Sequence, residues 1–152
     1  REALTLADIL VVMNGGVVAK IGSPLDIYSK PKTTFVASVI GAPPMNLIKL
    51  RDDALGTAVT GTGAGILGVR PEDLAVGSEG AEGIRATAVL VRDTGRDYLV
   101  TARTVVDGLE SDLVVRHSGG PVPVKGESVV LGVRAGATLH LFDAGSGVRL
   151  PD

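Results

Sequence analysis

The chain of 152 residues contains no cysteine and no tryptophan, and it has only two tyrosines and two phenylalanines. The absence of thiols excludes disulfides, thiolate chemistry and cysteine-ligated zinc sites. So few aromatic rings leave no stacking platform for single-stranded nucleic acid. The 15 lysines and arginines are scattered and the formal net charge is −2, so the chain also lacks the basic footprint that phosphate-backbone binding requires. We therefore expect no nucleic-acid partner.

Long hydrophobic runs are also missing. The apolar fraction is 45%, but an uninterrupted run such as Ile9 to Met13 has about five residues, whereas a membrane-spanning helix needs about 20. No basic segment followed by an apolar stretch precedes a cleavage site. We expect a soluble chain without an export signal. Because it begins with Arg1 instead of Met, we also expect a fragment of a longer protein.

The N-terminal residues predict a hairpin. Residues 1–8 are good helix formers and are typical of the last turns of a helix. Ile9 to Met13 is a β-branched apolar run that predicts a buried strand, and Asn14-Gly15 follows it directly. Because both positions of a tight hairpin turn favour positive φ, Asn-Gly is a strong hairpin signal. Val17 to Ile21 is then the returning strand.

Two short helices are expected next. Ser23 before Pro24 predicts a helix from Pro24 to about Ser29 that ends before Pro31. Thr33 or Thr34 can cap a second helix, for which Gly41 is the expected C-cap. The apolar face of this second helix would pack on the first strand or on a partner subunit, and it comprises Phe35, Val36, Val39 and Ile40.

From Met45 onward, short strand-like stretches alternate with turn residues, which favours a small barrel or sandwich. We therefore predict two domains, at 1–44 and 45–152. Glycine-rich loops are expected at Gly61 to Gly65 and at Gly77 to Gly83. The expected strands are Asn46 to Leu50, Gly56 to Thr60, Gly65 to Arg70, Ile84 to Arg92, Tyr98 to Thr104, Leu113 to His117, Ser128 to Val133 and Thr138 to Phe142.

Five polar residues are candidates for a regulatory or interface motif: Arg70, Glu72, Asp73, His140 and Asp143. The first three could recognise an anion or a partner, or they could stabilise a turn that starts at Pro71. A single Arg–acid pair on the surface contributes only about 0 to 1 kcal/mol, so it does not decide between these alternatives. His140 could be a pH-sensitive group. The structural alternative places it on the polar face of a strand whose Leu139 and Leu141 point inward.

No constellation for metal binding or covalent catalysis stands out. The two histidines, His117 and His140, lack the spacing of a zinc site. Ser111 and Asp112 could be combined with His117 into a triad, but no nucleophile-elbow motif is present, and solvated loop positions explain these residues equally well.

A nucleotide site is also missing from the residues given. A phosphate cradle needs a glycine-rich loop that ends in Gly-Lys-Ser/Thr and leads into a helix. None of the lysines has this setting, and Lys125-Gly126-Glu127-Ser128 has the order reversed. We expect no catalytic, cofactor-binding or metal-binding residue in this chain. The lysines are Lys20, Lys30, Lys32, Lys49 and Lys125.

Several motifs resemble a known family in their order and spacing over about 140 residues. They are the segment Arg1 to Asp8, Val12-Met13-Asn14-Gly15-Gly16, Ile21-Gly22-Ser23-Pro24, Phe35-Val36-Ala37, Ile40-Gly41-Ala42-Pro43 with Met45-Asn46, Gly68-Val69-Arg70-Pro71-Glu72-Asp73, and His140-Leu141-Phe142-Asp143 with Gly147. The chain resembles the C-terminal part of the MalK/UgpC-like ATP-binding subunits of ABC transporters that import carbohydrates and glycerol phosphate.

The resemblance implies a mainly β chain, in which an OB-like (TOBE) barrel regulatory domain follows a β-hairpin and short helices left over from an α/β ATPase domain. In the family this domain holds two ATP-binding subunits together, and in some members it receives regulatory proteins. The resemblance also implies a full-length parent that is a transport ATPase using ATP and magnesium. Its membrane permease partners would hold it at the inner face of the bacterial cell membrane, on the cytoplasmic side.

An alternative function is also open. TOBE-type folds in other proteins bind small oxyanions, so the chain could instead be a small-ligand binding domain. That alternative predicts a pocket of polar groups and requires no dimer.

Overall fold

The computed structural model describes residues 10–14, 17–22, 28–50, 65–77, 83–106 and 108–151. The helical end expected at 1–8, the strand expected at Gly56 to Thr60 and most of both expected glycine loops lie outside these residues. Two compact units are formed, one by Arg1–Gly68 with Leu139–Asp152 and the other by Val69–Thr138. The predicted boundary at 44/45 separates the segment expected to belong to an ATPase domain from the segment expected to belong to a regulatory domain. It stays a prediction.

The first unit contains the expected N-terminal hairpin. Strands β1 (Leu10–Asn14) and β2 (Val17–Gly22) pair antiparallel, which confirms the prediction. Asn14 pairs with Val17 and is therefore the last residue of β1. The expectation that Asn14 occupies a turn position is wrong, because the ladder extends one residue further than its apolar run.

A helical segment and one short helix precede the first sheet. Tyr28 and Ser29 are helical, and the rest of the helix expected from Pro24 lies outside the described residues. Helix α3 (Thr34–Val39) begins at Thr33, whose hydroxyl oxygen accepts the Val36 N–H at 3.2 Å, so the predicted cap is confirmed. The C-cap is Ile40 and not Gly41, which follows it at a φ of +110°.

The predicted apolar face of α3 is wrong at one position. Val36 and Ala37 are fully buried, whereas Val39 is 45% exposed. Two residues along a helix lie on roughly opposite sides of its axis, so burying Ala37 turns Val39 towards solvent. Ala37 packs in a core with Met45 and Phe142, and Leu47 and Ile66 lie against this core.

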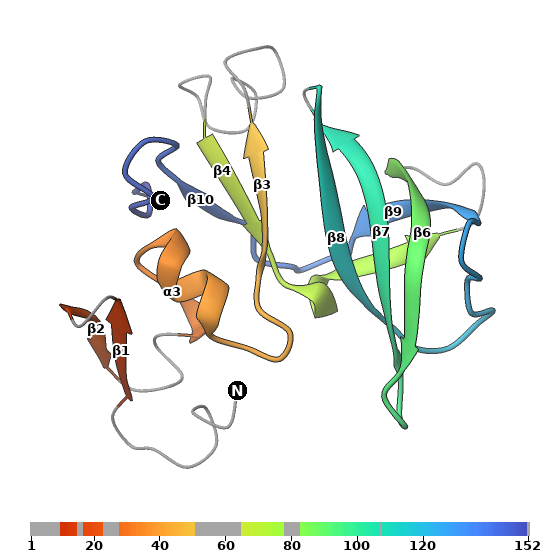
Figure 1. Ribbon diagram of the computed structural model, residues 1–152, viewed down its shortest axis with the longest axis horizontal. Coiled ribbons are helices and arrows are strands. Elements are labelled where there is room, and N and C mark those ends of the chain that lie inside the picture. Colours follow the sequence, from red (N-terminus) through yellow and green to blue (C-terminus); the bar gives the residue numbers. More distant parts are fainter. Residues whose placement is uncertain are drawn as a thin grey trace. The chain divides into compact units, whose positions relative to one another are not determined.

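Besides the β1-β2 hairpin, the first unit contains a three-stranded sheet in the order β10-β4-β3 (Figure 1). Its strands are β3 (Asn46–Leu50), β4 (Gly65–Val69) and β10 (His140–Phe142). The predicted strands are confirmed, although β10 begins at His140 instead of Thr138. Helix α3 contacts β3, so the helix and the sheet enclose the core.

The second unit is a five-stranded antiparallel sheet in the order β5-β9-β6-β7-β8. The short 3-10 helix η1 (Pro71–Asp73) and strand β5 both contact β8, so the sheet curls (Figure 1). The described chain is thus mainly β with a curled antiparallel sheet, as expected for an OB-like barrel. The strands are β5 (Leu74–Gly77), β6 (Ile84–Asp93), β7 (Tyr98–Val106), β8 (Leu109–His117) and β9 (Ser128–Val133).

Alternation along the strands divides this sheet into a buried and an exposed face. Val100 and Ala102 of β7 and Val115 of β8 are fully buried. On the exposed face, Arg103 donates from Nε to the Asp112 carboxylate at 2.8 Å. Strand β5 was not expected, and β8 begins four residues before the predicted Leu113 because its polar first half still pairs with β7.

Candidate functional site

Arg149 joins the C-terminal segment to the residues that lead into α3. Its Nε donates to the Pro31 carbonyl oxygen at 2.7 Å, and its backbone N–H donates to the Lys32 carbonyl oxygen at 2.7 Å. The guanidinium carbon lies 5.4 Å from the centroid of the Phe142 ring, within the range of a cation–π interaction. Arg149 therefore links the C-terminal segment to the residues before α3 and to β10 within the first unit.

His140 is the fourth contact of this arginine. Its Nδ1 lies 2.7 Å from Arg149 Nη2. Because a guanidinium has donors and no acceptor, Nδ1 must accept this hydrogen bond. His140 is therefore neutral here and carries its proton on Nε2.

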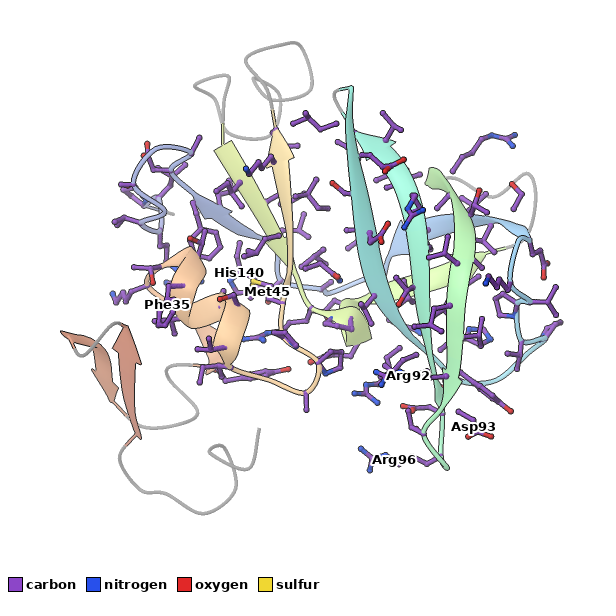
Figure 2. The ribbon with its side chains drawn as sticks, in the orientation of Figure 1. Phe35, Met45, Arg92, Asp93, Arg96 and His140 are labelled. Carbon is purple, nitrogen blue, oxygen red and sulfur yellow. The ribbon has the colours of Figure 1, made fainter. Side chains whose placement is uncertain are left out.

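The expectation that His140 lies on the polar face of its strand is wrong. His140 is only 3% exposed, whereas Leu139, expected to point inward, is 47% exposed. Phe142 is fully buried, and alternation places His140 on the same side of β10. The opposite residue on β4 is Gly68, where an added Cβ would lie 3.3 Å from the His140 Cβ. An added Cβ would come closest to the Met45 sulfur and then to the Phe142 ring, so the missing side chain at Gly68 makes room for these side chains beside His140 (Figure 2).

Asp143 organises the turn that follows β10. Its carboxylate accepts the backbone N–H groups of Gly145 at 3.0 Å and Ser146 at 2.7 Å. Hydrogen bonds from Ser146, and then from Gly145, lower the pKa of Asp143. On the far side of the turn, the Gly147 carbonyl oxygen accepts the Thr34 N–H at 2.8 Å. Asp143 thus shapes the turn that contacts the start of α3.

The other three candidates lie together in the turn at η1. The Asp73 N–H donates to the Arg70 carbonyl oxygen at 3.0 Å, and Arg70 is only 3% exposed. Arg134 reaches the same turn: its Nε donates to the Glu72 carbonyl oxygen at 3.1 Å. Partial burial raises the pKa of Asp73, the nearby Glu72 adds to this, and the two arginines act in the opposite direction. The turn expected at Pro71 is present, and an interface role for these residues stays a prediction.

The alternative sites considered around His117 are not assembled. His117 is buried, and its Nε2 lies 3.0 Å from the Pro121 carbonyl oxygen. The Asp112 carboxylate instead binds Arg103. Within the part of the chain that the structure describes, no three His, Asp or Glu side chains gather in a way that could hold a metal ion.

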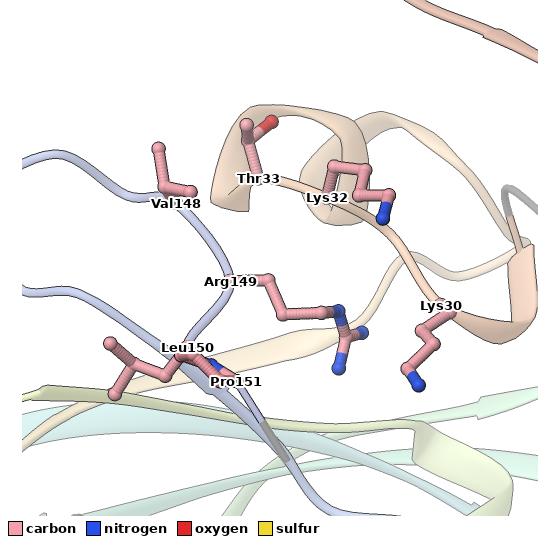
Figure 3. A pocket seen from close by; sticks show the side chains of 7 residues that line it. All are labelled: Lys30, Lys32, Thr33, Val148, Arg149, Leu150 and Pro151. Atoms are coloured by element: carbon pink, nitrogen blue, oxygen red, sulfur yellow. The ribbon is translucent and has the colours of Figure 1, made fainter.

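A shallow pocket of about 390 Å³ opens beside Arg149 in the first unit (Figure 3). Three of its seven lining side chains are cationic and none is acidic. The lining residues are Lys30, Lys32, Thr33, Val148, Arg149, Leu150 and Pro151.

Comparison with known proteins gives a consistent result. No protein-family model matches the chain. The "sn-glycerol-3-phosphate import ATP-binding protein UgpC" of Rhodopseudomonas palustris (strain CGA009) is 46% identical over 98% of the chain. Proteins of the same name are 42% identical over 98% of the chain in Cereibacter sphaeroides and 38% identical over 99% in Chromohalobacter salexigens. The chain is a homologue of the UgpC proteins.

The homology covers part of each UgpC relative. The matched stretch is 46% of the Rhodopseudomonas protein and 44% of each of the other two. The chain thus spans about half the length of the UgpC proteins it matches. Among the described residues, no helix is long and apolar enough to cross a membrane.

Sequence reasoning about this UgpC homologue missed Arg149 and the pocket beside it. The only local sign was the pair Lys30 and Lys32, which flank Pro31. Arg149 contacts Pro31 across 118 positions of sequence, and no local pattern predicts such a contact.

Proposed function

We propose that this chain is the C-terminal regulatory and dimerisation region of the ATP-binding subunit of an ABC importer for sugars or glycerol phosphate. The observation that carries the proposal is the 46% identity, over 98% of the chain, to a protein named as an import ATP-binding protein for sn-glycerol-3-phosphate. Similar identities to the proteins of the same name in another strain of that species and in Cereibacter sphaeroides support it. The curled antiparallel sheet of residues 69–138 fits the OB-like regulatory domain that the family resemblance implies.

In this proposal the parent protein is a transport ATPase that uses ATP and magnesium, and the chain itself binds neither. The reason is chemical. Transfer of a phosphoryl group needs a backbone cradle, a lysine and a hydroxyl that binds magnesium. None of the five lysines follows a glycine-rich loop in the sequence given. We expect no ATP hydrolysis by the isolated chain.

The partners follow from the same proposal. Permease subunits in the membrane would bind the parent and hold it at the inner, cytoplasmic face of the bacterial membrane. A regulatory protein is a further candidate partner, with the motifs Arg70, Glu72 and Asp73 or His140 and Asp143 as the proposed sites. Arg70 and His140 are buried, so the contacts themselves would come from the acidic residues of each motif.

Pairing of two copies would use the exposed face of the curled sheet. Leu90 on β6 is 49% exposed and Val105 on β7 is 62% exposed. Leu90 lies opposite Thr101, and residues 101, 103 and 105 point to the same side of β7 by alternation. Apolar side chains around the Arg103–Asp112 ion pair form a surface of mixed character, which is typical of protein interfaces.

A chimera tests the proposal directly. The aligned segment of the Rhodopseudomonas UgpC protein would be replaced by this chain, and uptake of sn-glycerol 3-phosphate would be measured in cells that lack their own UgpC protein. We expect the chimera to support uptake, and we expect a UgpC protein truncated before the segment to fail. A chimera that accumulates normally yet imports no better than the truncated protein would contradict the proposal.

A further inference from the structure

We propose that the pocket lined by Lys30, Lys32 and Arg149 is a binding site for a phosphate group. We call it the basic pocket. This inference goes beyond the proposed function, because it assigns a small-anion ligand to the chain itself. It rests on the composition of the lining, on the fixed position of Arg149 and on the size of the cavity.

The charge of the lining is of one sign. Lys30 and Lys32 come from the segment before α3, and Arg149 comes from the C-terminal segment. None of the described residues that line the pocket is acidic. Figure 3 shows Arg149 extending towards the 30–32 segment, with the side chain of Lys32 above its guanidinium group and that of Lys30 to the right of it in this view. Like charges held close together raise the local potential, and an anion between them lowers the free energy of the cluster.

Arg149 is held in place before any ligand arrives. The Pro31 carbonyl oxygen accepts from its Nε, and His140 Nδ1 lies 2.7 Å from its Nη2. The ring of Phe142 lies beneath the guanidinium carbon at 5.4 Å. A planar guanidinium with a fixed orientation binds phosphate oxygens with little further loss of conformational entropy. The two exposed lysines supply additional charge from flexible stems.

The size and the remaining lining accommodate a phosphate group together with part of the molecule that carries it. The pocket volume is about 390 Å³, near the lower end of the range for small-molecule sites. Val148, Leu150 and Pro151 complete the wall with apolar surface. Apolar walls reduce the local dielectric constant and so strengthen the attraction between the cations and a bound anion.

Calorimetric titration of the full chain with inorganic phosphate, at constant ionic strength set with chloride, tests the site. The variant Lys30→Gln/Lys32→Gln removes two charges from the pocket. Its matched control is Lys49→Gln/Lys125→Gln, which removes two exposed lysines that do not line the pocket. We expect saturable binding to the wild-type chain, binding within twofold of it in the control, and affinity lower by about tenfold or more in the pocket variant.

Three results would overturn the proposal: no saturable binding of phosphate, an equal loss of affinity in both double variants, or equally tight binding of uncharged glycerol. Titration with sn-glycerol 3-phosphate identifies the source of the phosphate group. Tighter binding of this ester than of inorganic phosphate supports a site for phosphate monoesters, and equal binding supports a site for the free ion. These measurements use the chain alone, so their failure would not bear on the importer proposal.

Discussion

Nη2 of Arg149 lies 2.7 Å from Nδ1 of His140, and Nε of the same arginine donates to the Pro31 carbonyl oxygen at the same distance. Arg149 and Pro31 are 118 positions apart in the sequence. The arginine therefore closes the first unit by fixing the C-terminal segment against the entry to α3.

Replacing Arg149 by glutamine should destabilise the fold. The substitution removes the bond to Pro31, the bond to His140 and the contact with the Phe142 ring. We expect the free energy of unfolding to fall by about 2 to 4 kcal/mol, measured by urea denaturation. The control is Arg92→Gln, at an exposed position of β6. It should change the free energy of unfolding by about 0.5 kcal/mol or less. Equal effects in both variants would contradict this role for Arg149.

Alanine substitutions at Gly147 and Gly119 distinguish the free-energy cost of a steric clash from the cost of a left-handed backbone. Both have a φ of +73°, but a Cβ at Gly147 would lie 2.6 Å from Thr34 Oγ1, and a Cβ at Gly119 would meet nothing within 4 Å. Gly119→Ala should cost about 1 to 2 kcal/mol for the left-handed backbone alone. Gly147→Ala should cost about 1 to 3 kcal/mol more, because the new methyl group overpacks the turn.

A second substitution checks the cause of the Gly147 effect. Thr34→Ala removes the hydroxyl that the new methyl group would meet, and Thr33, not Thr34, caps α3. We expect Gly147→Ala to cost no more than Gly119→Ala when both are measured in the Thr34→Ala background. If the extra cost persists in that background, the clash with Thr34 is not its source.

Acid should weaken the turn at Asp143. Hydrogen bonds from Ser146 and Gly145 hold the pKa of Asp143 below its ordinary value of 3.8. Between the folded and unfolded pKa values, the unfolded chain binds more protons than the folded one. The stabilisation is therefore complete above the ordinary value and is lost as the pH falls through the folded pKa.

The variant Asp143→Asn isolates this effect. An asparagine oxygen can still accept the two backbone N–H groups but does not titrate in this range. The urea midpoint of the variant should fall less than that of the wild type between about pH 5 and pH 2. Asp97 and Asp112, whose pKa values are also lowered, remain in both proteins, so some acid sensitivity persists. Parallel pH profiles would exclude a contribution from Asp143.

If two copies pair through the curled sheet, substitution of Leu90 should lower the mass of the particle in solution from that of a dimer to that of a monomer. Light scattering over a range of concentrations should give a dimer for the wild-type chain. Leu90→Arg should give a monomer, because it places a charge within an apolar contact. Val124→Arg alters a side chain that is 65% exposed and lies outside the strands, and it should remain dimeric. A wild-type chain that is monomeric at every concentration would argue against pairing through this region alone.

Local sequence patterns predicted most of the secondary structure. The strand ranges of β3, β6, β7 and β9 follow their apolar residues and the turn residues between them. The cap at Thr33 could be predicted from the sequence because a hydroxyl residue precedes an apolar helical stretch. The family resemblance also came from local motifs, and the relatives bear it out.

Local sequence patterns did not predict strand β5 or the burial of His140. Leu74–Gly77 has only four residues and follows a turn, and it forms a strand because Val130 to Val133 pair with it from the far end of the unit. His140 is a polar residue whose burial depends on Arg149, a distant hydrogen-bond partner.

The sequence by itself thus determined the mainly β class, the hairpin, the capped helix and the family, because alternation, turn residues and caps act between neighbours in the chain. The tertiary structure alone decided which polar side chains are buried and which cations share a pocket. Burial of His140 and placement of Arg149 beside Lys30 and Lys32 depend on contacts between distant segments, and their free energy exists only once those segments have packed together.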